Sequence, residues 1–211
     1  MRRIKAFIAY ADEDSDVGEN IKKCLERCYG IIAFFSPEDT WTSEDFEEKI
    51  YEELPTSDLF IPLISTHFHK SIYANQEVGM ALAYKRSIFP VSLDGKKPEG
   101  FISKKQAYPL FKKNYDPPFQ AATAIYLALL NSKKYRELRA FTKNSLVHAL
   151  CTSNDFYDSI KIISMMIRIK DFNRTQLTKI VHSIKNERCV RDCSSLPSLK
   201  KHLLNTYGIQ T

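Results

Sequence analysis

The chain has 211 residues, an apolar fraction of 44% and a formal net charge of +6. This length suits one domain of good size with a smaller addition, and the composition is ordinary for a soluble globular protein. The apolar run after the first basic residues ends at an acidic cluster, too early for a signal peptide. No stretch approaches the roughly 20 apolar residues of a membrane span. We therefore expect a cytoplasmic protein without membrane contact.

Positive charge is concentrated in the last part of the chain. Residues 1–130 hold 16 Lys and Arg against 19 Asp and Glu, whereas residues 131–211 hold 15 against 6. Such a basic tail could contact nucleic acid, acidic lipid, another protein or the acidic first part. The tail lacks the aromatic and basic interleaving of known RNA or DNA modules, so we favour a solvated helical surface that is open to a protein partner.

Strand-like and helix-like segments alternate in the first part of the chain. Short apolar runs predict strands at residues 5–11, 31–35, 58–65, 87–93 and 107–110. Helical periodicity predicts helices at 17–28, at 43–54 with a stop before Pro55, at 71–85, and from Phe119 onward. The alternation predicts an α/β fold, a flavodoxin-like parallel five-stranded sheet of order 2-1-3-4-5. Because the pattern then becomes purely helical, we divide the chain into an α/β domain, 1–130, and a basic helical domain, 131–211.

Glu77 stands out in the small-residue helix SIYANQEVGMALAYK, residues 71–85. Burying a carboxylate without partners costs several kcal/mol or makes it take up a proton, so it needs a polar partner or an opening to a cavity. In doubly wound sheets, ligands bind outside the carboxyl ends of the strands, where strands 1 and 3 diverge. Since this helix follows strand 3, we expect Glu77 to face that crevice, near helix N-terminal amides that favour an anion.

Five segments in matching order resemble a TIR domain of the prokaryotic type over roughly residues 1–130. They are KAFIAYADEDSD, SPEDTWTSEDFEEKI, SDLFIPLIS, SIYANQEVGMALAYK and FPVSLDGKKPEGFI. Enzymatic members of that family carry an aromatic-x-x-x-Glu pattern in the third helix, and this glutamate is needed to cleave NAD. The matching residues are Tyr73 and Glu77, with tyrosine in place of the usual tryptophan.

The resemblance implies an NAD⁺ nucleosidase that breaks the nicotinamide–ribose bond and gives ADP-ribose or a cyclic isomer, in antiviral or immune-type signalling. NAD⁺ would then be the substrate, and no cofactor is expected. Nicotinamide leaves as a neutral group, so one carboxylate that stabilises the ribosyl cation is sufficient. Glu77 is the candidate catalytic residue.

The other candidate residues follow from position. Tyr10 and Ala11 end strand 1, and Phe35 and Ser36 end strand 2. Tyr73 is a candidate substrate-facing ring, and Ser71 is either a helix cap or a ligand contact. These residues are candidates for substrate binding.

Family members often complete the site from two chains, with the loop after strand 2 of one protomer on the next. Here that loop is 36–43 with Trp41, which implies a head-to-tail homo-oligomer.

Several alternatives remain beside this hypothesis. A TIR scaffold could act without catalysis, by self-association or by recruiting a partner. Nucleoside deoxyribosyltransferases share the layout and use a glutamate, so another ribosyl-bond transfer is possible. A response-regulator receiver is excluded, because Ile64 and Leu110 stand where it needs an aspartate and a lysine. We expect no metal site, since neither Cys189 and Cys193 nor the histidines have zinc-ligand spacing, and we expect the five cysteines to be free thiols.

Overall fold

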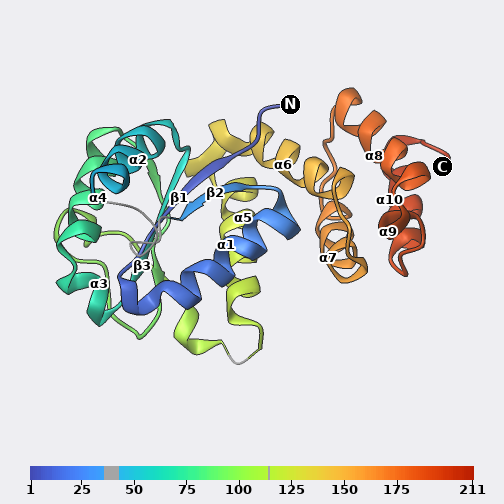
Figure 1. Cartoon of the computed structure of the whole chain (residues 1–211). Coiled ribbons are helices and arrows are strands. Elements are labelled where there is room, and N and C mark those ends of the chain that lie inside the picture. Colours follow the sequence, from blue (N-terminus) through green and yellow to red (C-terminus); the bar gives the residue numbers. More distant parts are fainter. Residues whose placement is uncertain (36–42, 114) are drawn as a thin grey trace.

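A computed structural model of the chain describes residues 1–35, 43–113 and 115–211, and the side chains of 43–46 lie outside that description. Within it, strands and helices alternate up to α5, and helices alone follow (Figure 1). The strands are β1 Lys5–Ala9, β2 Ile32–Phe35, β3 Leu59–Ile64, β4 Ser87–Ile88, β5 Val91–Ser92 and β6 Tyr108–Pro109. The class that the sequence predicts, a parallel α/β sheet followed by helices, is confirmed.

The strands form one parallel sheet in the order β2-β1-β3-β5-β6, and β4 also pairs with β3. The predicted fourth strand is thus divided into β4 and β5. Pro90 lies at the break, and proline has no N–H to donate to a neighbouring strand. Apart from this division, the order corresponds to the predicted 2-1-3-4-5.

The α-helices extend close to the predicted limits in most cases. They are α1 Ser15–Tyr29, α2 Ser43–Thr56, α3 Thr66–Lys70, α4 Ile72–Ala83, α5 Pro117–Asn131, α6 Arg139–Cys151, α7 Phe156–Met166, α8 Arg174–Asn186, α9 Arg188–Arg191 and α10 Leu196–Tyr207. Two predictions were wrong in detail. The helix α2 continues through Pro55, which in the last turn removes only one backbone hydrogen bond. The short α3 was not predicted.

Short 3₁₀ turns connect several of these elements. They are η1 Asp12–Asp14, η3 Gly100–Ile102, η4 Leu110–Lys112 and η5 Lys133–Leu138. The turn η5 follows the end of α5 directly and leads the chain into α6. The end of α5 therefore lies next to the predicted domain boundary at residue 130.

The two faces of the sheet bury alternate residues of the same strands. In β1, Ala6 and Ile8 belong to the core on the α1 and α5 face, whereas Phe7 and Ala9 belong to the core on the α2 and α4 face. Figure 1 shows these helices on opposite sides of the sheet. Burial on both faces explains why all six residues of β3 are apolar and buried.

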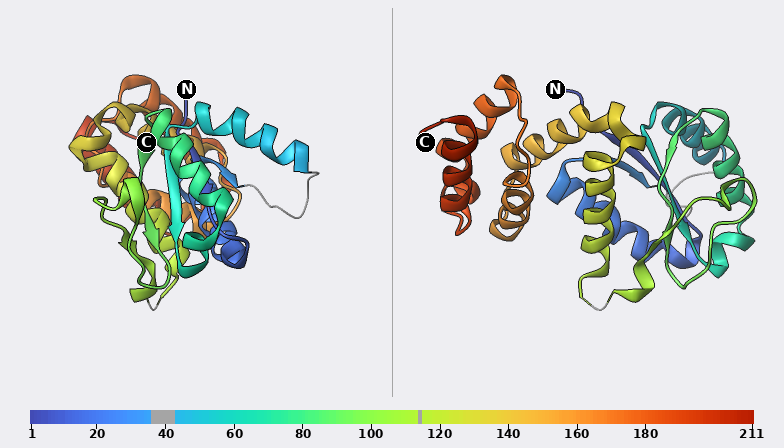
Figure 2. Two further views of the ribbon diagram at one scale, coloured as in Figure 1. Left: turned by 90° about the vertical axis from the view of Figure 1, so that its left-hand side faces the viewer. Right: turned by 180° about the vertical axis from the view of Figure 1, so that it is seen from behind.

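The helical tail continues the first of these cores. Apolar residues of α6, α7, α8 and α10 belong to the same buried cluster as those of α1 and α5. The N-terminus lies beside α6 in both Figure 1 and the rear view of Figure 2. There the Ile4 backbone N–H donates to Ser145 Oγ at 2.9 Å, and Asn144 Nδ2 donates to the Arg2 carbonyl at 3.0 Å. The tail therefore packs directly on the α/β part.

Gly30 is the residue that allows this contact. It caps α1 in the left-handed conformation, with φ of 63°. A Cβ atom at this position would lie 2.0 Å from the Ser145 carbonyl oxygen and 3.1 Å from the Ala149 backbone nitrogen. Only glycine leaves enough space for α6 to approach this turn so closely.

We predict that Gly30→Ala separates the tail from α1, and Gly208→Ala is the matched control. Gly208 also ends a helix, at φ of 68°, but a Cβ there meets nothing within 4 Å. The control should lose only the left-handed strain, about 1–2 kcal/mol of the free energy of unfolding. Gly30→Ala should lose a further 1–3 kcal/mol or so, from overpacking. Urea unfolding of both variants measures the difference, and equal losses would contradict this account of the contact.

Candidate functional site

Two aromatic rings lie together at the carboxyl edge of the sheet. Tyr10 follows β1 and Phe35 ends β2, and their rings stack at a centroid distance of 4.1 Å and an angle of 7°. Gly18, the fourth residue of α1, makes room for this pair, because a Cβ there would lie 2.4 Å from Phe35 Cε2. Ala11, next to Tyr10, is 3% exposed. The structure therefore places three of the predicted site residues at the ends of β1 and β2.

Hydrogen bonds connect the segments that follow β1, β3 and β5. Ser65, after β3, donates from Oγ to Asp14 Oδ2 at 2.5 Å and accepts from the Phe68 backbone N–H at 2.9 Å. Thr66 donates from its backbone N–H and its hydroxyl to Asp94 Oδ2, at 2.8 and 2.7 Å. These bonds fix three loop starts relative to one another at the edge where such sheets bind ligands.

Burial raises the pKa of the Asp14 carboxyl, and the hydrogen bond from Ser65 partly opposes this shift. Asp14 belongs to an acidic cluster that is visible in the sequence, but its pairing with Ser65 was not predicted. The two residues are 51 positions apart, and only the parallel pairing of β1 with β3 brings them together.

Glu77 lies on the buried stripe of α4. The buried residues of this helix are Ala74, Glu77, Val78 and Ala81, which share one face at helical spacing. This face lies toward β1, β3 and α2, and Glu77 is only 7% exposed. Glu77 also takes part in a polar, ring or electrostatic contact. The structure thus holds a carboxylate on the otherwise apolar inner face of α4.

Glu77 lies farther from the amino end of α4 than we predicted, so the helix N-terminal amides stabilise its charge less. The helix begins at Ile72, so Glu77 is its sixth residue and lies in the second turn. The effect of helix N-terminal amides falls off within the first turn. Ser71 is the N-cap of this helix, and its Oγ accepts a hydrogen bond from the Ala74 N–H at 3.2 Å. The structure thus shows Ser71 as the helix cap, and its contact with a ligand stays a prediction.

Tyr73 precedes Glu77 by one turn and is half exposed, at 48%. Ile72 beside it is also exposed, and so is Tyr84, the C-cap at the other end of the helix. The helix therefore has exposed apolar side chains at both ends in addition to its buried face. Two predicted contacts, Ser36 and Trp41, lie outside the residues that the structure describes. The predicted role of the loop 36–43 therefore stays a prediction.

One comparison with known proteins shows the family of this chain. A family model for the TIR domain matches residues 6–124, more than half of the chain. The chain belongs to the TIR domain family. Among solved structures, it is similar to the TIR domain of the Toll-related receptor TRR-2 from Hydra magnipapillata, with 21% identity and a TM-score of 0.47 over 57% of this chain and 94% of that one. No curated protein matches the chain.

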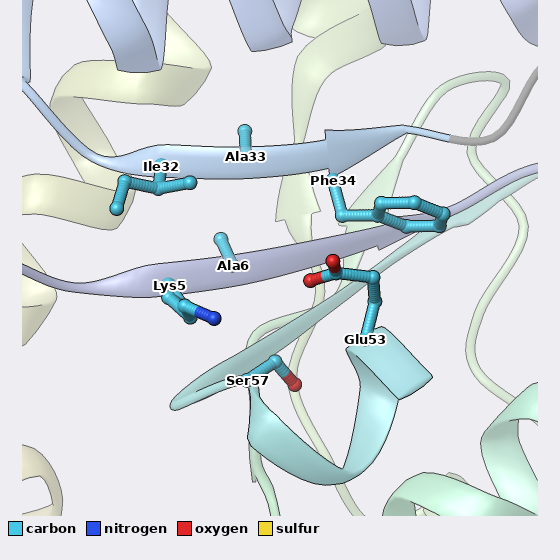
Figure 3. Close-up of a pocket in the computed structure, with 7 residues that line it drawn as sticks. All are labelled: Lys5, Ala6, Ile32, Ala33, Phe34, Glu53 and Ser57. Carbon is cyan, nitrogen blue, oxygen red and sulfur yellow. The ribbon is translucent and has the colours of Figure 1, made fainter. Parts of the chain in front are cut away.

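The TIR domain also has a pocket at the opposite edge of its sheet. This pocket of about 130 Å³ lies at the amino ends of β1 and β2, where Lys5 and Ile32 meet Glu53 and Ser57 from the end of α2 (Figure 3). Ligands of doubly wound sheets bind at the carboxyl ends of the strands, so we do not assign NAD⁺ to this pocket.

Three further features of the described residues concern metal ligands, membrane spans and cysteines. No group of three or more His, Cys, Asp or Glu side chains among them is placed to hold a metal ion. Within the same residues, no helix combines the length and apolarity that crossing a bilayer requires. All five cysteines are free thiols.

We predict that Gly18→Ala disturbs the Tyr10–Phe35 ring pair, and Gly79→Ala is the control. Both glycines lie inside helices, but a Cβ at Gly79 meets nothing within 4 Å. The control should gain about 0.5–1 kcal/mol from helix propensity. Gly18→Ala should instead lose about 1–3 kcal/mol, because the Phe35 ring must move. Thermal unfolding and near-ultraviolet circular dichroism test this; a Gly18→Ala variant as stable as Gly79→Ala, with an unchanged aromatic signal, would refute it.

Proposed function

We propose that this TIR protein is an NAD⁺ nucleosidase with Glu77 as its catalytic carboxylate. The observation that carries the proposal is the burial of Glu77, at 7% exposure, at the position that matches the family glutamate and one turn after the aromatic Tyr73. Polar groups retained in apolar surroundings are strong candidates for functional sites. A role in antiviral or immune-type signalling in the cytoplasm belongs to the same proposal.

The chemistry needs little more than a negative charge in the correct place. The bond between ribose C1′ and the nicotinamide nitrogen breaks, and its electron pair neutralises the pyridinium ring, which leaves without a proton. The ribosyl group becomes oxocarbenium-like, and a carboxylate beside it stabilises this positive charge more strongly in low-dielectric surroundings than in water. Water then adds and loses a proton to give ADP-ribose, or an atom of the same molecule closes a cyclic isomer. Tyr73, Tyr10 and Ala11 would shape the space around the substrate.

Glu77→Gln tests the catalytic role, since it keeps the shape of the side chain and removes the charge. We expect nicotinamide release from NAD⁺ to fall roughly 100-fold or more. Glu26→Gln, on the exposed side of α1, is the matched control and should keep the wild-type rate. Chromatography follows nicotinamide, and the mass of the co-product distinguishes ADP-ribose from a cyclic isomer or a transfer product. A Glu77→Gln variant that is as active as Glu26→Gln would exclude Glu77 as the catalytic group.

The second candidate function is a scaffold that acts by self-association, and the exposed surface of α4 favours it. Ile72 is 72% exposed, Tyr73 48% and Tyr84 43%. Exposed apolar side chains can contribute to contact sites between proteins. TIR domains commonly associate with one another, so this surface suits a homo-oligomer whichever function applies.

If assembly completes the site, specific activity should depend on protein concentration. We expect nicotinamide release per protein molecule to rise as the concentration increases from nanomolar to micromolar, and to rise less steeply in Ile72→Ser. Light scattering on the same samples reports the degree of assembly. Constant specific activity over this range would separate catalysis from assembly. Assembly without any turnover of NAD⁺ would favour the scaffold.

A further inference from the structure

A second pocket, of about 230 Å³, lies beside the ends of β5 and β6. Lys96, Lys97, Lys105 and Phe111 line it together with smaller residues, and no Asp or Glu is among its lining residues. We call it the basic pocket. It contains none of the residues assigned to NAD⁺ cleavage, so it can be tested independently of that activity.

The positive charge of the basic pocket is local. Residues 94–113 hold six lysines and two acidic residues, whereas the remainder of residues 1–130 holds 10 Lys and Arg against 17 Asp and Glu. Within the described residues, none of the three pocket lysines forms an ion pair. The adjacent carboxylate, Asp94, already accepts hydrogen bonds from Thr66 and from the Lys96 backbone N–H. The lysine charges therefore lack a carboxylate partner in an otherwise acidic region.

Lys105 is the amine that is least well solvated. Its side chain is partly buried, and this burial lowers the pKa of Lys105, as does the nearby positive charge of Lys134. Lys134 itself donates to the Ile88 carbonyl at 3.0 Å and so is fixed in place. An ammonium group that has lost part of its water and lies near like charges gains more from an anion than an exposed lysine does.

The backbone around the basic pocket is held by internal hydrogen bonds. The buried Ser92 donates from Oγ to the Lys96 carbonyl at 2.7 Å. Gly95 has a φ of 93° and lies beside the Phe111 ring. A Cβ atom at this position would be 3.6 Å from Phe111 Cζ. Phe111 is 46% exposed, and Lys112 Nζ lies over its ring at 5.6 Å from the centroid. A site of this kind needs little rearrangement before binding.

We propose that the basic pocket binds the phosphate group of a small anionic ligand. Three lysines supply the charge, and charge-assisted N–H···O bonds to phosphate are among the strongest that proteins form. Two sources of this group fit the site: free inorganic phosphate, and a nucleotide whose base stacks on the Phe111 ring. Base stacking on an aromatic side chain contributes about 1–3 kcal/mol, so the two sources differ measurably.

Isothermal titration calorimetry of the full chain with inorganic phosphate, and separately with adenosine monophosphate, tests this proposal. Chloride is exchanged so that ionic strength stays constant, because diffuse surface charge alone is screened by salt. We expect one site per chain, and Lys105→Gln should weaken both ligands roughly tenfold or more. The control is Lys104→Gln, an exposed neighbour that does not line the pocket and should bind as wild type does.

Phe111→Leu distinguishes the two sources of the phosphate group. It should leave inorganic phosphate binding unchanged, and it should weaken adenosine monophosphate only if the base stacks on the ring. Far-ultraviolet circular dichroism confirms that each variant is folded, and a Lys96→Gln/Lys97→Gln double variant provides a second test if Lys105→Gln is not. The proposal is wrong if wild type binds neither ligand, or if Lys104→Gln weakens binding as much as Lys105→Gln does.

Discussion

The close approach of α1 to its neighbours at both ends is the constraint on which the rest of the structure depends. The Phe35 ring occupies the space that a side chain at position 18 would need. The Ser145 carbonyl oxygen occupies the corresponding space at position 30. A helix of 15 residues is about 22 Å long, at roughly 1.5 Å per residue. One rigid element therefore connects the carboxyl edge of the sheet with the tail. Any displacement of the tail against α1 acts on the helix that also supports the Tyr10–Phe35 ring pair.

The basic residues of the tail also take part in this packing. Part of that charge is used inside the molecule: Arg139 and Lys143 contact Asp171, and Lys161 lies 3.5 Å from Asp116. An acidic residue of the tail, Asp158, forms an ion pair with Arg27 of α1 at 2.7 Å. Two of these pairs, Lys161 with Asp116 and Asp158 with Arg27, join the tail to the α/β part. Charged side chains of both signs therefore hold the tail in place together with its apolar core.

Local patterns were sufficient to predict the alternating strands and helices, including the helix that carries Glu77, because these depend on periodicity within one segment. Contacts between distant segments left no such pattern. Ile4 and Ser145 are 141 positions apart, and neither residue type indicates their hydrogen bond. The basic pocket was missed for a related reason. Its lysines look like solvated loop residues until the fold places Lys105 beside Lys134 and away from a carboxylate.

The exposed and buried residues of α4 suit different functions, and this difference bears on the choice between enzyme and scaffold. Self-association needs only exposed side chains, such as those of Ile72, Tyr73 and Tyr84. It does not need a carboxylate on the inner face, where Ala74, Val78 and Ala81 show that small apolar residues fit. Removing a carboxylate from water is unfavourable even when it has partners. A scaffold would thus retain Glu77 at a cost in stability without using it, whereas a ribosyl-cation site requires a negative charge in such surroundings.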